Sequence, residues 1–354
     1  MVERFDRRFD KQQSSRRFAI LHFGVVIASL LSPLGAVAAT LPDEPPALPT
    51  DADQWINSGT LTYDNFRGKG VVLWYFEETC PRCAGKWPGM LEMSRNMSDK
   101  PVLFVAVNSG RSRGKIQSYI RKHEIDWPVL IDPDRSFEAA SEVGVISLQS
   151  INSMRLITAD GKFTYGYWND WQKSLDIALR DAKWNVKYDR LDPFMHDAVR
   201  RMEFGVYPPV ASAIDLGLQD ESPSVRRSAA FTRQYVEHQM QVELKRQIGG
   251  KDADDLWIQY QVLEAVASRF SPLDLPEHAS TQLEKLRADP GIQKEIRAAR
   301  AIDSNASMLT SADPDKRKRA ADNLERMQKT FAGTHAADRA AELLATASDA
   351  APQN

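Results

Sequence analysis

The chain has 354 residues, of which 46 are Lys or Arg and 48 are Asp or Glu, so its formal net charge is −2. This near balance gives no basic face that would favour nucleic acid. The length exceeds that of one typical domain and predicts two. The two cysteines, Cys80 and Cys83, are too close in sequence to form a disulfide framework for the fold.

The N-terminus has the features of an export signal. A basic start is followed by residues 18–40, which contain no Asp, Glu, Lys or Arg, and Ala36-Val37-Ala38 is the small-x-small pattern that signal peptidase reads. Residues 1–39 therefore predict a cleaved signal peptide and a periplasmic or secreted protein. Arg16-Arg17 matches a twin-arginine signal only in part, so Sec and Tat export both stay open. The alternative is an uncleaved signal that anchors the chain in a membrane.

The first half of the remaining chain alternates strand and helix patterns. Residues 40–54 are rich in proline and predict an extended linker. The alternation that follows predicts βαβ units with parallel strands, completed by a hairpin turned at Ala159-Asp160-Gly161. We expect strands at residues 71–76, 101–107, 129–131, 154–158 and 162–167. We expect helices at residues 88–97, 115–123, 135–142 and 171–184. These elements predict an α/β domain over residues 55–190.

The second half has almost no strand signal after Asp192-Pro193, so we expect an all-α helical domain over residues 191–347 and a disordered tail at 348–354. The expected helices cover residues 194–204, 209–218, 224–247, 254–270, 276–287, 291–310, 314–331 and 334–346. Residues 222–230 resemble the start of a HEAT-type repeat helix, and residues 318–340 resemble a tetratricopeptide-like (TPR-like) helix pair. An irregular helical bundle without a repeat is the alternative.

The most informative motif is Cys80-Pro81-Arg82-Cys83, which lies between an apolar predicted strand and a predicted helix. A disulfide with this spacing can open and close within one helical turn, which favours thiol–disulfide exchange. A permanently oxidised structural bridge and metal binding are the alternatives. Because two thiolates alone do not complete a tetrahedral zinc site, we expect no metal, and nothing in the sequence indicates a cofactor.

The motif belongs to a longer pattern. Its other parts are the turn Phe66-Arg67-Gly68-Lys69-Gly70, Thr79 before the first cysteine, Pro88 five residues after the second, Asp132-Pro133-Asp134, and Asp160-Gly161-Lys162. Over about residues 55–185 the chain resembles the thioredoxin superfamily, in particular its exported reductase-like branch related to peroxiredoxins. The resemblance implies a thioredoxin-like fold, with protein thiols and disulfides and a redox partner protein as partners. The Pro-x-x-x-Thr-x-x-Cys spacing of peroxiredoxins is missing, so we do not expect peroxidase activity.

Position and resemblance together suggest roles for the residues of the motif. Cys80 is expected at the helix N-terminus, partly accessible, where unpaired N–H groups and the helix dipole stabilise a negative sulfur, and it is the candidate nucleophile. Cys83, one turn further in and more enclosed, is the candidate resolving cysteine. Pro81 stiffens the first turn, and Pro88 occupies the place of the family's helix-kinking proline. Arg82 adds a cation near the thiolate, whereas Glu77 and Glu78 act in the opposite direction.

The sequence departs from the family pattern at three positions. Asn152 stands where members carry a cis-proline, so we expect a trans Ile151–Asn152 bond with Asn152 and Ser153 facing the site. Trp74 stands where many members keep a buried acid, and Thr79 replaces the usual tryptophan.

Two functions remain open at this point. The first is an extracytoplasmic thiol-disulfide oxidoreductase that acts on protein substrates, which the intact cysteines favour. The second is a non-enzymatic binding or scaffold protein with a degenerate thioredoxin-like module and a partner-binding helical domain, which the missing cis-proline favours. Four aromatic residues near the hairpin, Tyr165, Tyr167, Trp168 and Trp171, are expected in the core rather than in a lip around the site.

Overall fold

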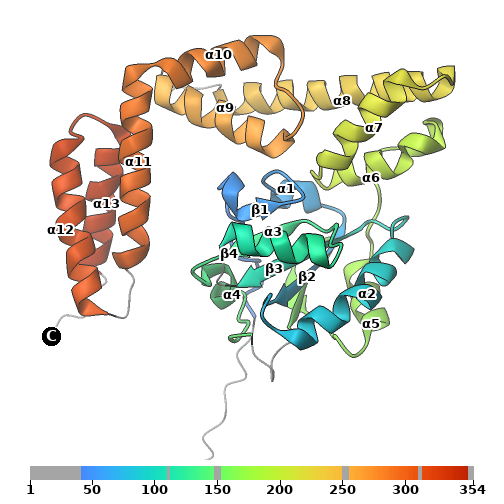
Figure 1. Cartoon of the computed structure of the whole chain (residues 1–354), viewed down its shortest axis with the longest axis horizontal. Helices are drawn as coiled ribbons and strands as arrows, with labels where there is room; N and C mark the ends of the chain where they lie inside the picture. Colours follow the sequence, from blue (N-terminus) through green and yellow to red (C-terminus); the bar gives the residue numbers. More distant parts are fainter. Residues whose placement is uncertain (1–40, 110–111, 147–152, 249–254, 310–312, 350–354) are drawn as a thin grey trace, which may run out of the picture. The chain divides into compact units, whose positions relative to one another are not determined.

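The computed structural model describes residues 41–349 except 110–111, 147–152, 249–254 and 310–312. Within them a mixed six-stranded sheet is followed by a long run of helices, which confirms the predicted fold class (Figure 1). We call residues 41–190 the sheet region and residues 191–349 the helical region. The strands are β1 (Trp55–Ile56), β2 (Gly70–Phe76), β3 (Val102–Ser109), β4 (Val129–Asp132), β5 (Met154–Ile157) and β6 (Phe163–Tyr165).

The helices of the sheet region are α1 (Tyr63–Phe66), α2 (Pro81–Asn96), α3 (Arg113–Lys122), α4 (Ser136–Ala140) and α5 (Trp171–Ala178). Those of the helical region are α6 (His196–Glu203), α7 (Pro208–Gln219), α8 (Pro223–Ile248), α9 (Leu256–Phe270), α10 (Glu277–Ala288), α11 (Pro290–Leu309), α12 (Pro314–Thr330) and α13 (His335–Asp349). Short 3-10 helices lie at Ala52–Gln54, Tyr188–Arg190 and Pro193–Met195.

β2 lies inside the sheet, whose strand order is β1-β4-β3-β2-β5-β6. It pairs in parallel with β3, from Gly70 opposite Val102 to Phe76 opposite Asn108, and antiparallel with β5. Every residue of β2 and β3 is buried, as expected for parallel strands rich in β-branched and aromatic residues with both faces covered. The carboxyl end of β2 leads directly into the cysteine motif.

Two glycines fix the start of β2. Gly68 has φ +75°, in the left-handed region that few residues other than glycine adopt. A Cβ on Gly70 would lie 2.5 Å from the carbonyl oxygen of Ala178 at the end of α5, so no side chain fits there. Gly68 and Gly70 thus allow β2 to start at this place in the sheet, and the cysteine motif follows the other end of the strand.

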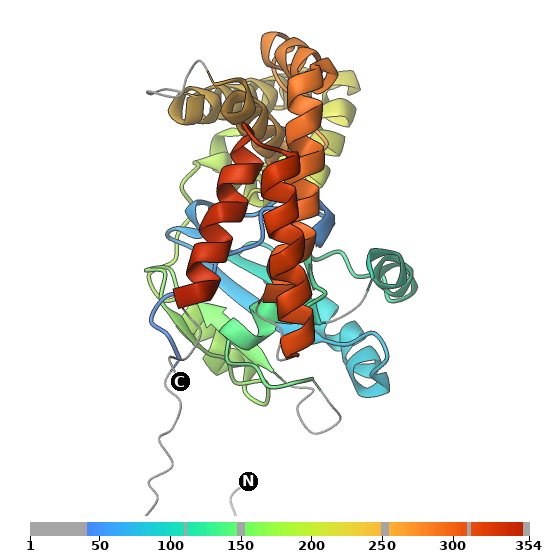
Figure 2. The ribbon, with the colours of Figure 1, turned by 90° about the vertical axis from the view of Figure 1, so that its left-hand side faces the viewer.

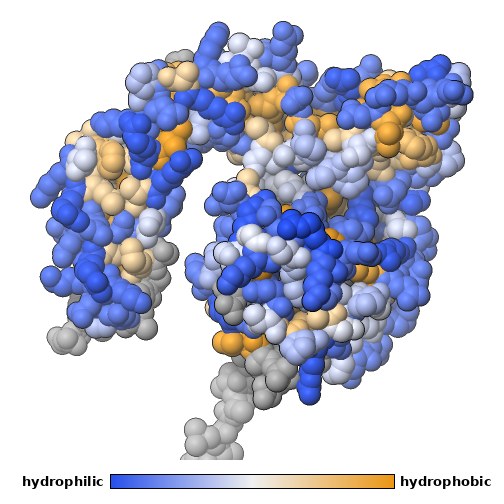
Figure 3. Space-filling view, viewed as in Figure 1, coloured by the Kyte–Doolittle hydropathy of each residue, from blue (hydrophilic) through white to orange (hydrophobic). Residues whose placement is uncertain are grey.

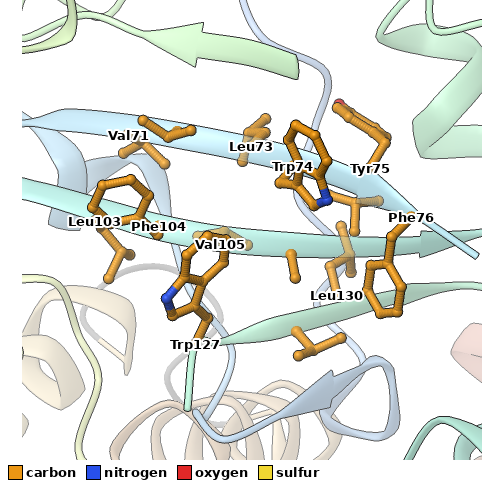
Figure 4. Close-up of a cluster of buried hydrophobic side chains, with 14 of the residues drawn as sticks. Val71, Leu73, Trp74, Tyr75, Phe76, Leu103, Phe104, Val105, Trp127 and Leu130 are labelled. Carbon is orange, nitrogen blue, oxygen red and sulfur yellow. The ribbon is translucent and has the colours of Figure 1, made fainter. Parts of the chain in front are cut away.

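Aromatic residues fill the core around β2 and β3, as Figure 4 shows. The rings of Phe104 and Trp127 stack with their centroids 5.1 Å apart, and Trp74 stacks on Trp171 of α5 at 5.9 Å. Large buried rings of this kind contribute much of a domain's apolar burial and hold the elements around them rigidly. The loop that follows β2 therefore starts from a fixed base.

The proline-rich segment before β1 lies against the sheet. The Phe163 N–H donates to the carbonyl oxygen of Asp43 at 3.1 Å, and the Trp55 Nε1–H donates to that of Pro49 at 2.9 Å. The side chains of Leu41 and Leu48 pack against the core. This part of the predicted linker is extended and makes contacts that its sequence did not indicate.

The helical region buries apolar clusters of its own. One includes Val210, Ile214, Val236 and Val266, and another surrounds Leu324 in α12. Figures 1 and 2 both show α11, α12 and α13 side by side. The observed helices agree with the predicted ones to within a few residues, while the resemblance to HEAT and TPR repeats remains a prediction.

The surface of the helical region includes hydrophobic side chains. Figure 3 shows them on the visible face over α7, α8 and α9. The exposed large hydrophobic residues of these helices are Leu216, Phe231, Val242 and Leu256. None of the described helices has both the length and the apolar character needed to cross a membrane.

Several elements of the sheet region differ from expectation. The helix expected over residues 88–97 begins at Pro81, and the four-residue helix α1 was not predicted. The helix predicted over residues 171–184 ends at Ala178, because the chain turns through Asp181 at φ 62° so that the Lys183 N–H donates to the carbonyl oxygen of Gly68 at 2.9 Å. The strand β1 was not predicted, since its two residues are too few to show a periodic pattern.

Candidate redox site

Cys80 is the N-cap residue of α2, and Pro81 is the first residue of the helix. The Cys80 N–H donates to the carbonyl oxygen of Glu77 at 3.2 Å, and the carbonyl oxygen of Cys80 accepts the Ala84 N–H at 3.1 Å. Proline suits the first helical position because its fixed φ matches the helix and its missing N–H would have no partner there. The motif therefore starts a helix at the end of β2.

The two sulfur atoms are neighbours, and both cysteines are free thiols. The Cys83 N–H points at the Cys80 Sγ at 3.4 Å, so this sulfur takes the place of an N-cap oxygen. Cys80 is 8% exposed and Cys83 is 1% exposed. The outer cysteine is thus the more accessible of the two, although it is less exposed than the sequence led us to expect.

Burial has a strong effect on Cys83. It raises the pKa of this thiol to about 12, and the charges of Cys80 and Glu77 raise it as well, while a hydrogen bond with the Glu77 backbone lowers it. Cys83 therefore keeps its proton at neutral pH. A thiol in this state becomes a nucleophile only when its proton is removed during the reaction.

Two acidic residues of the loop between β2 and α2 have different partners. Glu77 forms an ion pair with Arg135, which also contacts Glu138. The Glu78 carboxylate accepts a hydrogen bond from the Asn108 Nδ2 at 3.3 Å. Asn108 lies at the end of β3, next to the end of β2 in the sheet. Neither Arg135 nor Asn108 was among the predicted site residues.

Three aromatic residues beside the cysteine motif, Phe76, Trp87 and Tyr119, pack against one another. The Phe76 ring lies 5.2 Å from Trp87 of α2 and 5.5 Å from Tyr119 of α3, and the Trp87 Nε1–H donates to the Tyr119 hydroxyl at 3.0 Å. Burial raises the pKa of Tyr119 to about 12, the hydrogen bond with Trp87 lowers it, and the charges of both cysteines raise it further. The helical spacing of Tyr119 with Ile116 and Ile120 predicted core packing and gave no sign of this position.

A surface groove of about 470 Å³ adjoins the site. It is lined by Glu78, Thr79, Gly114, Lys115, Ser118, Tyr119 and Lys122. Thr79 and Arg82 are both exposed, as are Pro81 and Pro88. Pro88 lies inside α2, which continues past it to Asn96.

The aromatic residues near the hairpin are mostly at the surface, so the expectation of core packing is wrong for three of them. Tyr165 is 43% exposed, Tyr167 39% and Trp168 43%, while only Trp171 packs inward, on Trp74. The Lys86 Nζ of α2 lies 4.7 Å from the centre of the Trp168 ring. Trp168 therefore adjoins the helix that carries the cysteines.

The loop expected to face the cysteines is described only at its end. Asn152 and the Ile151–Asn152 bond lie outside the described residues. Ser153 is half-buried, and its carbonyl oxygen accepts the Tyr75 N–H at 3.2 Å, which places it beside β2. The position where many thioredoxin-like proteins keep a buried acid is occupied by Trp74, which is 1% exposed. Among the described residues, no group of three or more His, Cys, Asp or Glu side chains is arranged to hold a metal ion.

Comparison with known proteins agrees with this geometry. Residues 46–165 match the AhpC/TSA family. The thiol-disulfide oxidoreductase ResA of Bacillus subtilis (strain 168) is 28% identical over 87 residues, which are 25% of this chain and 49% of ResA. ResA of Bacillus cereus (strain ATCC 10987 / NRS 248) is 27% identical over 152 residues, 40% of this chain and 84% of the relative. A thiol:disulfide interchange protein of the thioredoxin family from Chlorobium tepidum TLS has 18% identity and a TM-score of 0.32, covering 40% of this chain and 98% of that structure.

The chain is therefore thioredoxin-like over about residues 46–165, and these relatives support a redox function in general. The chain spans about half the length of the Bacillus subtilis relative, 49%, and its helical region lies outside the family match.

Proposed function

We propose that this protein is an extracytoplasmic thiol-disulfide oxidoreductase that exchanges disulfides with protein substrates through Cys80 and Cys83. The observation that carries the proposal is the placement of Cys80 at the N-cap of α2, with the Cys83 N–H directed at its sulfur. A thiolate at this position is stabilised by the helix dipole and by that N–H group. Cys80 attacks the substrate disulfide, and the buried Cys83 resolves the mixed disulfide.

The environment of the site supports a difference in role between the two cysteines. Cys83 is buried and holds its proton, so it is a poor first nucleophile, whereas Cys80 is the more exposed sulfur. In this proposal Pro81, Arg82, Thr79 and Glu78 shape the entrance to Cys80, Pro88 shapes α2, and Asn152 and Ser153 contact the substrate. Export of the chain rests on the signal-like residues 1–39.

Reduction of insulin by the purified protein tests the activity. We expect turnover with dithiothreitol or a thioredoxin-type reductant, abolished in Cys80→Ser. A Cys83→Ser variant should accumulate a mixed disulfide with the substrate, visible as a mass increase that a reductant removes. Insulin reduction that persists in Cys80→Ser would contradict the proposal. A folded protein without any cysteine-dependent turnover would favour the scaffold function instead.

Cell fractionation tests the location separately. A fusion of the chain to a reporter that is active only outside the cytoplasm should be active, and deletion of residues 1–39 should remove that activity. A cytoplasmic location of the full chain would contradict the extracytoplasmic part of the proposal but leave the chemistry untouched.

A further inference from the structure

Arg135 lies between two carboxylates at the edge of the redox site. Its Nη2 pairs with the Glu77 Oε1, three residues before Cys80, and its Nη1 lies 3.3 Å from the Glu138 Oε1. The Glu77 side chain is 17% exposed and that of Glu138 is 2% exposed. Arg135 thus connects the loop after β2 with the first turn of α4, although the two residues of the Glu77 pair are 58 positions apart.

The backbone around Arg135 holds its side chain in place. Arg135 has φ 62°, a left-handed conformation that is uncommon for residues with a side chain. The buried Asp132 carboxylate accepts the N–H groups of Phe137 at 3.1 Å and Glu138 at 2.7 Å, and its carbonyl oxygen accepts the Arg135 N–H at 3.2 Å. Such conformations persist where the surrounding structure enforces them, often beside functional sites.

Glu77 acts on the dithiol from the other end of this ion pair. Its carbonyl oxygen accepts the Cys80 N–H, and its backbone also hydrogen-bonds the Cys83 thiol. Its carboxylate charge opposes ionisation of Cys83. Burial is the largest cause of the raised pKa of Cys83, and the Glu77 charge adds a smaller contribution in the same direction.

We propose that Arg135 is a positioning residue for the dithiol: it neutralises the Glu77 charge beside Cys83 and so speeds the step in which Cys83 releases the substrate. The inference rests on the proposed function and adds to it a residue that sets the rate of resolution. Among the described residues, the other charged or titratable groups of this network include Cys80, Tyr119 and Glu78 around Cys83, and Glu138, Asp132 and Asp134 around Arg135.

Resolution of the mixed disulfide needs no oxidant or reductant beyond the substrate and the two cysteines. The substrate sulfur is bonded to Cys80, and the Cys83 thiol gives its proton to a base from the solvent. The Cys83 sulfur then attacks the Cys80 Sγ, so that a Cys80–Cys83 disulfide forms and the bond from Cys80 to the substrate breaks. The substrate sulfur leaves with the electron pair and takes up a proton. The substrate disulfide is reduced, and the dithiol of the protein is oxidised.

A two-phase reaction with 5,5′-dithiobis(2-nitrobenzoate) isolates this step. With the reduced full-length protein, attack by Cys80 releases one coloured thiolate, and resolution by Cys83 releases the second. The Glu77 charge is a small contribution beside burial, so we expect it to shift the pKa of Cys83 by about one unit or less, and the weaker nucleophilicity of a more acidic thiolate offsets about half of this. We therefore expect the second phase at pH 7 to slow by up to about threefold in Arg135→Gln and to accelerate by a similar factor in Glu77→Gln.

The pH profile and the double variant separate electrostatics from structure. The profile of the second phase should move to higher pH in Arg135→Gln and to lower pH in Glu77→Gln. In the Glu77→Gln background, Arg135→Gln should have a much smaller effect, because the charge that Arg135 neutralises is gone. Arg135→Lys keeps a cation and should remain near the wild-type rate.

Matched charge changes at exposed positions provide the controls. Glu92→Gln on α2 and Arg121→Gln on α3 remove the same charges from side chains at the surface, and should change the second phase by less than about twofold. Shifts in the same direction for Arg135→Gln and Glu77→Gln, or equal shifts in the controls, would overturn the inference. If circular dichroism shows that Arg135→Gln does not fold, two other variants test the inference. It then requires a faster second phase in Glu77→Gln and a near wild-type rate in Arg135→Lys. A wild-type protein that shows both phases but leaves insulin intact would reject the proposed function, while the rates of the Arg135 and Glu77 variants would still show whether Arg135 acts on Cys83.

Discussion

In the helical region the buried Glu295 carboxylate accepts the backbone N–H groups of His335 and Ala336 at the start of α13, at 2.9 and 3.3 Å. In the sheet region the buried Glu138 carboxylate contacts Arg135 through one oxygen, while the other has no hydrogen-bond partner among the described residues. The first acid caps a helix and has its bonds satisfied. The second lies in a charge network with Arg135, Asp132 and Glu77, and its unpartnered oxygen carries a free-energy cost that a satisfied polar group does not.

Other buried polar groups do not divide so cleanly between the regions. Ser228 and Thr232 of α8 hydrogen-bond to the backbone. In the same region the Ser268 Oγ and the Arg269 Nε lack a partner within the described part of the chain. At the carboxyl end of β3, Asn108 and Ser109 are also buried with an oxygen that lacks one. Unpartnered buried polar atoms thus lie in both regions, and one group of them lies at the edge of the sheet that carries the dithiol.

The largest expected effect concerns the ion pair that joins the two regions. The Lys69 Nζ, just before β2, lies 3.6 Å from the Glu203 carboxylate at the end of α6, and both side chains are almost completely buried. Burial lowers the pKa of Lys69, and the Glu203 charge opposes this. Glu203→Gln leaves a buried cation without its partner, so we expect a loss of about 3–5 kcal/mol in the free energy of unfolding, measured by urea denaturation.

Two variants control for this result. Lys69→Met/Glu203→Gln should recover much of the loss, because no unpaired charge remains. Lys100→Met breaks an exposed pair with Asp99 and should cost less than about 1 kcal/mol. If Glu203→Gln is as mild as Lys100→Met, the two regions are not joined by this contact.

A pair of core substitutions compares the regions directly. Trp87 and Leu324 are both 0% exposed, the first beneath the dithiol and the second within α12. Trp87→Ala and Leu324→Ala should each cost about 3–4 kcal/mol. Trp87→Ala should also alter the rates of both thiol phases, since Trp87 lies one turn after Cys83, whereas Leu324→Ala should leave them within about twofold. Equal changes in thiol rates would show that the helical region influences the site, and the comparison would fail.

The next effect depends on pH. Burial raises the pKa of Glu138 from 4.5 to about 6, so the folded state binds this proton more tightly than the unfolded state. The stabilising contribution is complete below pH 4.5 and is lost as the pH rises through 6, which amounts to about 2 kcal/mol. Glu138→Gln removes the titration. Between pH 4 and 7, the stability of the wild type should therefore fall by about 2 kcal/mol relative to Glu138→Gln. A constant difference between the two proteins would contradict this assignment.

How far the sequence could predict this site depends on the range of the contacts. The period of apolar residues and the Cys80–Cys83 spacing are local, and they correctly indicated β2, α2 and the junction between them. The pair of Glu77 and Arg135 depends on a left-handed turn 58 positions away, which no local pattern reveals. Tyr119 has the spacing of a core residue and is one, yet its hydroxyl also accepts the Nε1–H of Trp87, on the helix that carries the cysteines.

For the aromatic residues near the hairpin, the sequence predicted core packing that the structure does not show for three of them. Composition favours burial for large rings, but it does not show which face of a short edge strand such as β6 is covered. Tyr165, Tyr167 and Trp168 are at the surface, and the sequence contained no signal that separated them from Trp171.

The smallest expected effect again compares one residue from each region. Tyr119 and Tyr207 are both buried, but only the Tyr119 hydroxyl accepts a hydrogen bond, from the Trp87 Nε1–H, within the described residues. Tyr119→Phe leaves that N–H buried without an acceptor and should cost about 1 kcal/mol, whereas Tyr207→Phe should cost less than about 0.5 kcal/mol. Urea denaturation with both proteins measured in parallel resolves the difference. Equal losses would mean that the hydrogen bond between Trp87 and Tyr119 does not stabilise the fold. The packing of the Phe76 ring against Trp87 and Tyr119 would then be the interaction that holds α2 and α3 together beside the cysteines.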